Sequence, residues 1–277
     1  MPELPEVETI ARGVDARIRG DQIVEAWFSN LPQPFKTPAA RQAKGLEGRW
    51  ILAVHRTGKH IVCELGPRPG AGTQPDAQWI VHLGMTGRLL VTTPDGAIAP
   101  HTHARLRLKS GREIRFVDPR RFGRLEFRTL SNTAGFQGAG REPLTISAEE
   151  FAALFRGRKL AIKAALLNQK LLTGVGNIYA DESLFRAGIR PRRSAGRLTR
   201  AELERLRLAL REVLEHATRL GGSSVSDYVD ADGVRGFFQL EHCVYLRTGL
   251  PCRTCTTLIQ RILLAGRGTH YCPRCQN

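Results

Sequence analysis

Four of the six cysteines are spaced in a way that can bind a metal. The two Cys-x-x-Cys pairs are Cys252 with Cys255 and Cys272 with Cys275. Four thiolates fill a tetrahedral zinc site and leave no open position, so the pattern predicts one structural zinc ion, Zn²⁺. Disulfides or redox thiols are the alternatives, but disulfides are rare in a reducing compartment. Cys63 and Cys243 belong to no such motif, and we expect both to be small core residues.

The N-terminus offers a second reactive group. Removal of Met1, which is expected before so small a residue, would leave Pro2 with a secondary amine. An α-amine has a pKa near ~8, so an appreciable fraction is neutral and nucleophilic at cellular pH. Such an amine can attack an electrophilic carbon and form an iminium ion, which is an electron sink. Met-Pro starts are common, but the nearby acids Glu3 and Glu6 strengthen this interpretation.

The chain of 277 residues has a net charge of +16, most of it supplied by arginine. Both halves of the chain share the excess, which favours a polyanionic partner that contacts both. Arginine-rich composition can also reflect genome base content, so charge alone is modest support for nucleic-acid binding. No apolar run is long enough to span a membrane, and the first residues carry acid where a secretory signal would carry base. We therefore expect a cytoplasmic protein.

The N-terminal half has the pattern of one helix followed by short strands. Residues 5–19 carry apolar side chains at helical spacing, with Pro5 in the first turn and Gly20 as the stop. Strands follow from Ile23 to about Phe127. Three pairs of strands are each predicted to flank a turn: 51–54 with 60–65, 79–83 with 88–92, and 105–108 with 113–117. This spacing is typical of an antiparallel sandwich or barrel.

The pattern becomes helical beyond a linker over 129–143, which is rich in Gly, Asn, Ser and Pro. Capping boxes begin two helices, one at Ser147 and one at Thr199, and the second helix is long and ends at Gly221. The other predicted elements are helices over 161–168 and 177–186 and a β-hairpin with strands 259–264 and 270–271 and its tip at 265–269.

Five landmarks occur in the order found in formamidopyrimidine-DNA glycosylases, and the sequence resembles that family from end to end. They are PELPEVET at 2–9, HLGMTG at 82–87, DPRRFG at 118–123, GVGNIYADE at 174–182 and the terminal zinc knuckles. Any one of them would be weak support, but five in order make the resemblance specific. Leu4 occupies a position where a sister family, which resembles endonuclease VIII and acts on oxidised pyrimidines, typically has glycine. The leucine therefore favours the family members that act on oxidised purines.

The resemblance implies an α+β fold and a DNA-repair activity. The implied domains are an N-terminal antiparallel β-sandwich with flanking helices (1–135), a helix–two-turn–helix module (136–240) and a zinc-finger β-hairpin (241–277). The implied enzyme is a bifunctional DNA glycosylase and AP lyase that removes oxidised purines, namely 8-oxoguanine and formamidopyrimidines. Its implied partner is duplex DNA with the lesion opposite cytosine, bound by a monomer at the bacterial nucleoid and not at a membrane.

The resemblance also assigns the catalytic residues. Pro2 is implied to attack the sugar C1′, displace the base and leave an iminium ion that permits β- and then δ-elimination. Glu3 is the implied proton donor that opens the sugar ring. Lys59 matches an essential lysine that could contact phosphate and help activate the site, although a lysine on a turn is usually just solvated. Glu6 is expected in the same site, and complementing the helix dipole could be its main role.

A base must leave the duplex before C1′ can be attacked, and something must fill the hole. The resemblance assigns this task to Met85, Arg120 and Phe122. Methionine is a flexible apolar wedge, phenylalanine can stack between base pairs, and arginine offers a donor fork to an orphaned cytosine. Ordinary core packing is the alternative for Met85 and Phe122.

Phosphate contacts are expected from the turn at 174–177, where backbone amides and the Asn177 side chain begin a helix. Arg267, at the hairpin tip, is expected to reach the DNA backbone and, by resemblance, to donate the proton for elimination. We expect the hairpin to have little besides zinc to hold it. A loop over 223–238 is expected to close over the extruded base. His270, which replaces an aromatic residue of some relatives, is not expected to bind zinc.

Two other functions remain open at this point. A non-catalytic zinc-finger protein that binds DNA or RNA would show the same charge and cysteines, but it would leave Pro2, Glu3 and Glu6 without a role. A glycosylase for oxidised pyrimidines would share the chemistry, and Leu4 together with the motif 120–122 disfavours it.

Overall fold

The computed structural model describes residues 1–277 except 32–34, 71, 131–133 and 226–227. The described residues form two compact units. The first unit contains residues 1–137 and 221–236, and the second contains residues 138–220 and 237–277. The described residues of 221–236 thus pack with the first unit, whereas the sequence-based boundaries place this range in the middle domain. Those boundaries remain a prediction.

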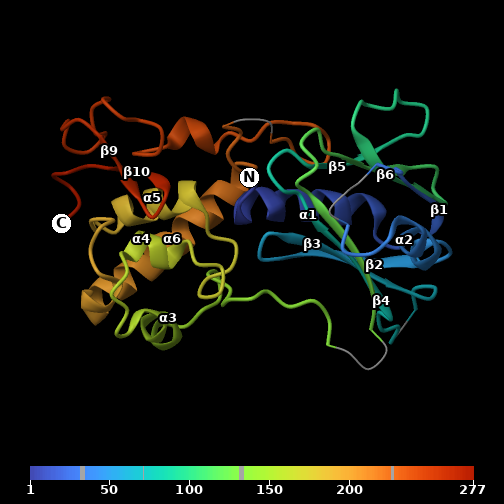
Figure 1. Ribbon diagram of the computed structural model, residues 1–277, viewed down its shortest axis with the longest axis horizontal. Coiled ribbons are helices and arrows are strands. Elements are labelled where there is room, and N and C mark those ends of the chain that lie inside the picture. The colour runs from blue at the N-terminus through green and yellow to red at the C-terminus, as the bar shows by residue number, and fades with distance from the viewer. Residues whose placement is uncertain (32–34, 71, 131–133, 226–227) are drawn as a thin grey trace. The chain divides into compact units, whose positions relative to one another are not determined.

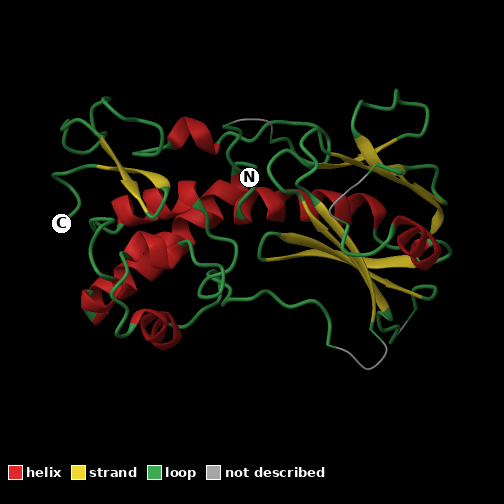
Figure 2. Ribbon diagram, in the orientation of Figure 1, coloured by secondary structure: helices red, strands yellow, loops and turns green. Residues whose placement is uncertain are grey.

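Two four-stranded antiparallel sheets dominate the described part of the first unit (Figures 1 and 2). The first sheet has the order β1 (Ile23–Phe28), β6 (Thr102–Leu108), β7 (Glu113–Val117) and β5 (Arg88–Thr92). The second has the order β2 (Trp50–Thr57), β3 (His60–Gly66), β4 (Ala77–His82) and β8 (Arg124–Thr129). Both sheets contribute to one apolar core, which confirms the predicted sandwich. Helix α2 (Ala39–Leu46), which we did not predict, packs on β1 and β8.

Helix α1 (Leu4–Ile18) contacts strands of both sheets. Val7, Ile10, Val14 and Ile18 recur at helical spacing and are all buried in the shared core. The first turn of the helix is buried as well. Burial of an amphipathic face stabilises a helix more than intrinsic propensity does, so this packing fixes the start of the chain.

The chain passes from one sheet to the other through residues 83–87. We expected β4 and β5 to flank a turn, but β4 pairs with β3 and β8, whereas β5 pairs with β7. Gly84 has a φ of +63°, a backbone conformation that other residues rarely adopt. The turn therefore joins two sheets, and it holds Met85 and Thr86 at the crossing.

The described residues of 221–236 complete the core of the first unit. Tyr228 and Ala231 are buried in it, and the Val91 N–H donates to the Ala231 carbonyl (3.2 Å). The predicted closing loop over 223–238 includes residues 226–227, which lie outside the described part of the chain.

The second unit is helical, as predicted. Its helices are α3 (Ala148–Phe155), α4 (Ile162–Leu166), α5 (Asn177–Arg186) and α6 (Arg200–Arg219), with short 3₁₀ turns at Ala195–Arg197 and Phe238–Glu241. Both predicted capping boxes form: the Glu150 N–H donates to Ser147 Oγ and the Glu202 N–H to Thr199 Oγ1, each at 3.2 Å. The apolar face of α6 packs on α3 and α5. No helix in the described part of the chain is long and apolar enough to cross a membrane.

Strands β9 (Gln260–Leu264) and β10 (Arg267–Tyr271) form the predicted hairpin. We expected a five-residue tip at 265–269, but only Ala265 and Gly266 lie in the turn, with φ of 48° and 72°. Two-residue turns of this left-handed kind match the twist of a hairpin. Arg267 is therefore the first residue of β10 and pairs with Leu264.

Candidate active site and nucleic-acid interface

The predicted N-terminal residues lie together at the start of α1. Pro2 and Glu3 are buried, and Glu6 is only 2% exposed. The Glu3 N–H donates to Glu6 Oε2 (2.8 Å), so the second carboxylate fixes the backbone beside Pro2. A buried carboxylate without a partner costs free energy, so breaking this hydrogen bond would be unfavourable. The bond therefore restrains the start of the chain.

The other oxygen of Glu6 reaches a distant part of the chain. Glu6 Oε1 accepts the Ser223 N–H (2.7 Å), and Tyr228 Oη donates to the Gly221 carbonyl (3.0 Å). A Cβ at Gly222 would lie 2.9 Å from Glu6 Oε1, and its φ is +81°, so glycine is required there. Glu6 therefore joins the N-terminus to segment 221–236. Glu6 was predicted as a site residue that could mainly complement the helix dipole, and nothing local in the sequence indicates its contact with Ser223.

Lys59 lies in the turn between β2 and β3, and it is buried rather than solvated, with 8% exposure. The neighbouring Arg56 donates from Nε to Glu8 Oε2 (2.8 Å), which fastens the hairpin to α1. The lysine charge acts on the N-terminal amine. Burial lowers the pKa of the Met1 amine, and the Lys59 and Arg120 charges lower it further, while the Glu3 and Glu6 carboxylates oppose the shift.

Met85, Arg120 and Phe122 present their side chains to solvent. Met85 is 44% exposed and Phe122 is 50% exposed, which does not fit core packing. The Arg120 guanidinium lies over the Phe122 ring, 4.8 Å from its centroid. Such a stack keeps the arginine extended and its donor edge free for a planar partner.

Asn177 and Arg267 are brought together in the second unit. Asn177 is the first residue of α5, and its Nδ2 donates to the Gly268 carbonyl (3.0 Å), directly after Arg267. We predicted phosphate contacts from the backbone amides of 174–177, and one of these amides, the Gly174 N–H, donates to Gln169 Oε1 (3.0 Å). Gln169 also donates from Nε2 to the Val175 carbonyl (2.7 Å), so this side chain shapes the turn.

A buried ionic network holds the same hairpin strand. Lys163 Nζ donates to the Gly268 carbonyl (2.9 Å) and to Thr269 Oγ1 (2.8 Å), and it lies 2.7 Å from Asp181 Oδ1. Asp181 Oδ2 accepts the His270 N–H (2.9 Å) and lies 3.1 Å from His270 Nδ1. Our expectation that the hairpin has little besides zinc to hold it is therefore wrong. His270 pairs with a carboxylate, which gives the departure from an aromatic residue a structural role.

The four predicted zinc ligands converge. The sulfurs of Cys252, Cys255, Cys272 and Cys275 all lie within 4.8 Å of one another. Val244 and Ile259 pack against them and shield the cluster. Four thiolates at this separation fit one tetrahedral zinc ion. Of the other cysteines, Cys63 is buried as predicted, whereas Cys243 is only partly buried.

Three family models match the chain in order. They describe the formamidopyrimidine-DNA glycosylase N-terminal domain (residues 1–125), the formamidopyrimidine-DNA glycosylase H2TH domain (139–229) and the zinc finger found in FPG and IleRS (249–277). A formamidopyrimidine-DNA glycosylase of Solibacter usitatus is 45% identical over 276 residues, covering 100% of this chain and 99% of the relative. The chain belongs to the formamidopyrimidine-DNA glycosylase family. It is a DNA glycosylase, and the family also has AP-lyase activity.

Solved structures of the family share the fold. The MutM (Fpg) protein of Thermus thermophilus is 41% identical, with a TM-score of 0.85 over 99% of this chain and 98% of that one. A Lactococcus lactis Fpg mutant bound to DNA containing Fapy-dG is 32% identical, with a TM-score of 0.87 over 100% of both chains. The wild-type Lactococcus lactis protein has also been solved with DNA containing an oxidised pyrimidine. It is 32% identical, with a TM-score of 0.86 over 100% of both chains. These complexes support DNA binding by the glycosylase, and the zinc-finger match agrees with the four-cysteine site.

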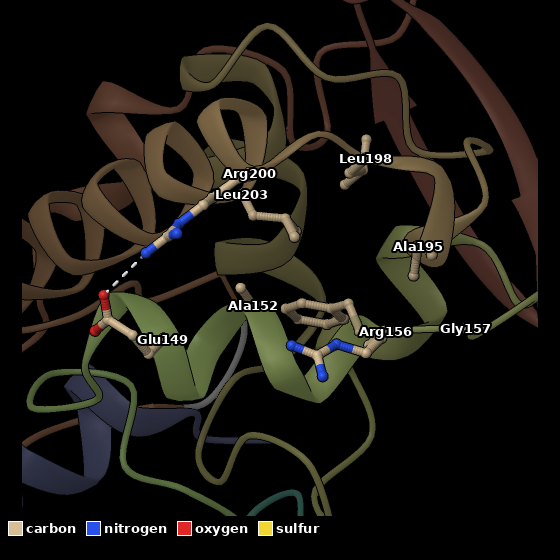
Figure 3. Close-up of a pocket in the computed structure, with 10 residues that line it drawn as sticks. Glu149, Ala152, Arg156, Gly157, Ala195, Leu198, Arg200 and Leu203 are labelled. Carbon is tan, nitrogen blue, oxygen red and sulfur yellow. Dashed lines mark hydrogen bonds and ion pairs between the residues drawn. The ribbon is translucent and has the colours of Figure 1, made fainter.

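One pocket of the glycosylase contains none of the predicted site residues. It lies between α3 and the start of α6, and Phe155 and Leu203 are among its lining residues (Figure 3). At its rim Arg200 pairs with Glu149 (3.2 Å), and both side chains are exposed. An exposed pair of this kind contributes little to stability.

Several residues that organise the sites were given no role from the sequence, although Asp118 and Asp181 lie within two of the landmark motifs. Lys163 and Asp181 are each charged yet fully buried, and Asp118 is fully buried beside two exposed loops. A lysine within the apolar stretch AIKAALL was the available signal for the first of these. Buried charges are almost always paired, so such a lysine indicates an unseen partner.

Proposed function

We propose that this glycosylase removes oxidised purines, 8-oxoguanine and formamidopyrimidines, from duplex DNA with Pro2 as the nucleophile. The observation that carries the proposal is the buried cluster of Pro2, Glu3, Glu6 and Lys59, in which burial lowers the pKa of the Met1 amine. Once Met1 is removed, the Pro2 amine lies among the same groups. Burial there favours the neutral form of an amine, and only the neutral amine is nucleophilic.

The reaction then follows from the chemistry of a secondary amine. The Pro2 nitrogen forms a bond to the sugar C1′, the bond from C1′ to the base breaks, and the departing base takes up the amine proton. Glu3 then protonates the ring oxygen as its bond to C1′ breaks and the nitrogen lone pair forms the iminium. The resulting iminium ion acidifies the C2′ proton. Loss of that proton expels the 3′ phosphate by β-elimination, and δ-elimination then expels the 5′ phosphate. Arg267 is the proposed proton donor for elimination, and Lys59 contacts a phosphate near the amine.

Opposite-base selectivity is proposed for Arg120. Cytosine offers its O2 and N3 acceptors to the guanidinium, whereas adenine presents an exocyclic amino donor beside N1. Excision opposite adenine would fix a mutation, so preference for cytosine suits a repair enzyme. Met85 and Phe122 are both exposed, and the Arg120 guanidinium lies over the Phe122 ring; they are the proposed wedge and stacking residue. The glycosylase is proposed to act as a monomer.

Borohydride trapping tests the nucleophile. We expect borohydride to reduce the iminium to a stable protein–DNA adduct on a duplex with one 8-oxoguanine, because the carbon–nitrogen bond then cannot hydrolyse. Mass spectrometry should place the adduct on the N-terminal tryptic peptide. An adduct at Lys59 would refute the role of Pro2, and excision of the lesion without any adduct would show that no iminium forms.

Oxidised pyrimidines are a second candidate substrate class. The complex of the Lactococcus lactis relative with oxidised-pyrimidine DNA is the observation that favours it. Leu4 and the motif 120–122 favour purines in this chain. Single-turnover excision of 8-oxoguanine and of an oxidised pyrimidine in the same duplex context decides between the two.

Zinc removal should weaken DNA binding. We expect Cys272→Ser to lose most of its zinc and to bind DNA about ten- to a hundredfold more weakly, because a charge-assisted hydrogen bond such as an Arg267–phosphate contact contributes about 1.5–3 kcal/mol. Metal analysis and DNA titration measure both effects. Lys163 and Asn177 still hold Gly268, so the loss should be partial. Unchanged DNA binding without bound zinc would contradict the structural role.

A further inference from the structure

Asp118 is a fully buried carboxylate between the two loops that carry Met85, Arg120 and Phe122. Its Oδ1 accepts the hydroxyl of Thr86 (2.6 Å), and its Oδ2 accepts the Gly123 N–H (2.7 Å). One oxygen therefore holds the loop 83–87, and the other holds the loop 118–123. Hydrogen bonds to a carboxylate are about twice as strong as neutral ones, and they strengthen where water is excluded.

Thr86 makes a second connection between the loops. Its Oγ1 donates to Asp118 and lies 3.4 Å from the Arg120 backbone nitrogen, which donates to it. The Arg121 N–H closes a turn onto the Asp118 carbonyl (3.2 Å). The backbone of Arg120 is thus held by Thr86 on one side and by its own turn on the other.

Backbone packing shows how closely the two loops approach. A Cβ at Gly84 would lie 2.5 Å from the carbonyl carbon of Phe122, and a Cβ at Gly123 would lie 2.4 Å from the ring of Phe116. No side chain can be inserted at either position without moving backbone or a buried ring. Met85 and Phe122, which lie next to these glycines, are therefore attached to closely packed backbone.

His82 makes a further contact with the loop 83–87. His82 Nδ1 accepts the Gly84 N–H (3.2 Å), which requires an unprotonated Nδ1. Burial lowers the pKa of His82 to about 4, so the imidazole is neutral at pH 7 and the contact persists. The loop 83–87 is consequently held at Gly84 and at Thr86.

We propose that Asp118 and Thr86 are positioning residues that fix Arg120 against Met85 and Phe122, and that their hydrogen bonds set the selectivity for the opposite base. This inference rests on the proposed function, because it assumes that Met85, Arg120 and Phe122 fill the space left in the duplex by the extruded base. Neither residue contacts the reacting atoms in this view. They act through the geometry of Arg120, whose donor fork must meet cytosine within a few tenths of an ångström.

Thr86→Val tests the inference with the smallest change. Valine has the shape of threonine but lacks the hydroxyl, so it removes the links to Asp118 and to the Arg120 N–H together. We expect the ratio of single-turnover 8-oxoguanine excision opposite cytosine to that opposite adenine to fall about three- to tenfold. Thr86→Ser, which keeps the hydroxyl, should restore most of the ratio. Asp118→Asn should lower the ratio too. The asparagine NH₂ group would face either the Thr86 hydroxyl or the Gly123 N–H, and both of these donate to Asp118 in the wild-type protein.

Controls separate this result from general damage. Arg120→Ala defines the fully flattened ratio, and Thr92→Val on β5 is the matched substitution elsewhere in the first unit. Equal losses on both duplexes for Thr86→Val, or an unchanged ratio, would overturn the proposal. Borohydride trapping of the wild-type protein on abasic-site DNA is measured in parallel. Its success leaves the proposed function intact whatever Thr86 does, whereas its failure would overturn the proposed function and this inference with it.

Discussion

A variant with one glycine inserted between Met1 and Pro2 should fold normally but lose at least about a thousandfold in strand cleavage. After removal of Met1, the amine would belong to the inserted glycine, about 3.8 Å away along the chain, and the Pro2 nitrogen would be an amide. Misplacement of a reacting group by about 1 Å can already cost about a hundredfold. The structure accommodates a residue before Pro2, because Met1 is 51% exposed there. Single-turnover cleavage and borohydride trapping measure the loss.

Pro2→Gly is the matched control for the inserted glycine. It leaves a primary amine at the position of the proline nitrogen, and primary amines form the same kind of iminium. We expect this variant to keep trapping activity, although at a reduced rate. If the variant with the inserted glycine trapped DNA as efficiently as Pro2→Gly, the position of the amine would not matter, and the proposed nucleophile would be wrong.

Lys163→Met should be the most destabilising substitution in the second unit. Asp181 is fully buried, and loss of its lysine partner leaves the carboxylate with His270 as its remaining partner, at a cost of up to about 3–5 kcal/mol. We expect the melting temperature to fall by about 10–20 °C. DNA affinity should fall as well, because the Gly268 carbonyl and Thr269 lose their shared donor beside Arg267. Calorimetry and DNA titration check the two effects.

A double variant distinguishes an unpaired charge from lost packing. Lys163→Met with Asp181→Leu removes both charges, so it should recover part of the stability lost in Lys163→Met alone. Recovery should be incomplete, because the His270 N–H then has no carboxylate to donate to. A double variant less stable than either single variant would show that the ion pair is not the source of the effect.

Features that depend on neighbouring residues were predictable from the sequence. The capping boxes at Ser147 and Thr199 form as expected, because each joins residues only three apart. The zinc site was predictable as well, since the spacing within each knuckle determines where its thiolates lie. The sandwich followed from alternating strands, although β4 and β5 proved to belong to different sheets.

Features that join distant residues were not predictable. The Glu6–Ser223 contact spans 217 residues, and the Lys163–Thr269 contact spans 106. A carboxylate or lysine in the sequence shows its charge but not its partner, which is fixed only when the two segments pack. The exposed fork of Arg120 could be assigned by resemblance, whereas Asp118, which binds Thr86 and Gly123 on either side of it, carries no reactive signature of its own.

The return of residues 221–236 to the first unit has a consequence during protein synthesis. The core around Tyr228 and Ala231, and the second partner of Glu6, come from a segment that follows helices α3 to α6 in the chain. Domains usually fold as units while they emerge from the ribosome. This unit lacks its final segment until residue 236 has emerged, so the chain start remains incompletely packed through most of translation. We therefore expect the enzyme that trims Met1 to reach it before this unit closes, although Met1 stays 51% exposed, with Pro2 buried, in the folded unit.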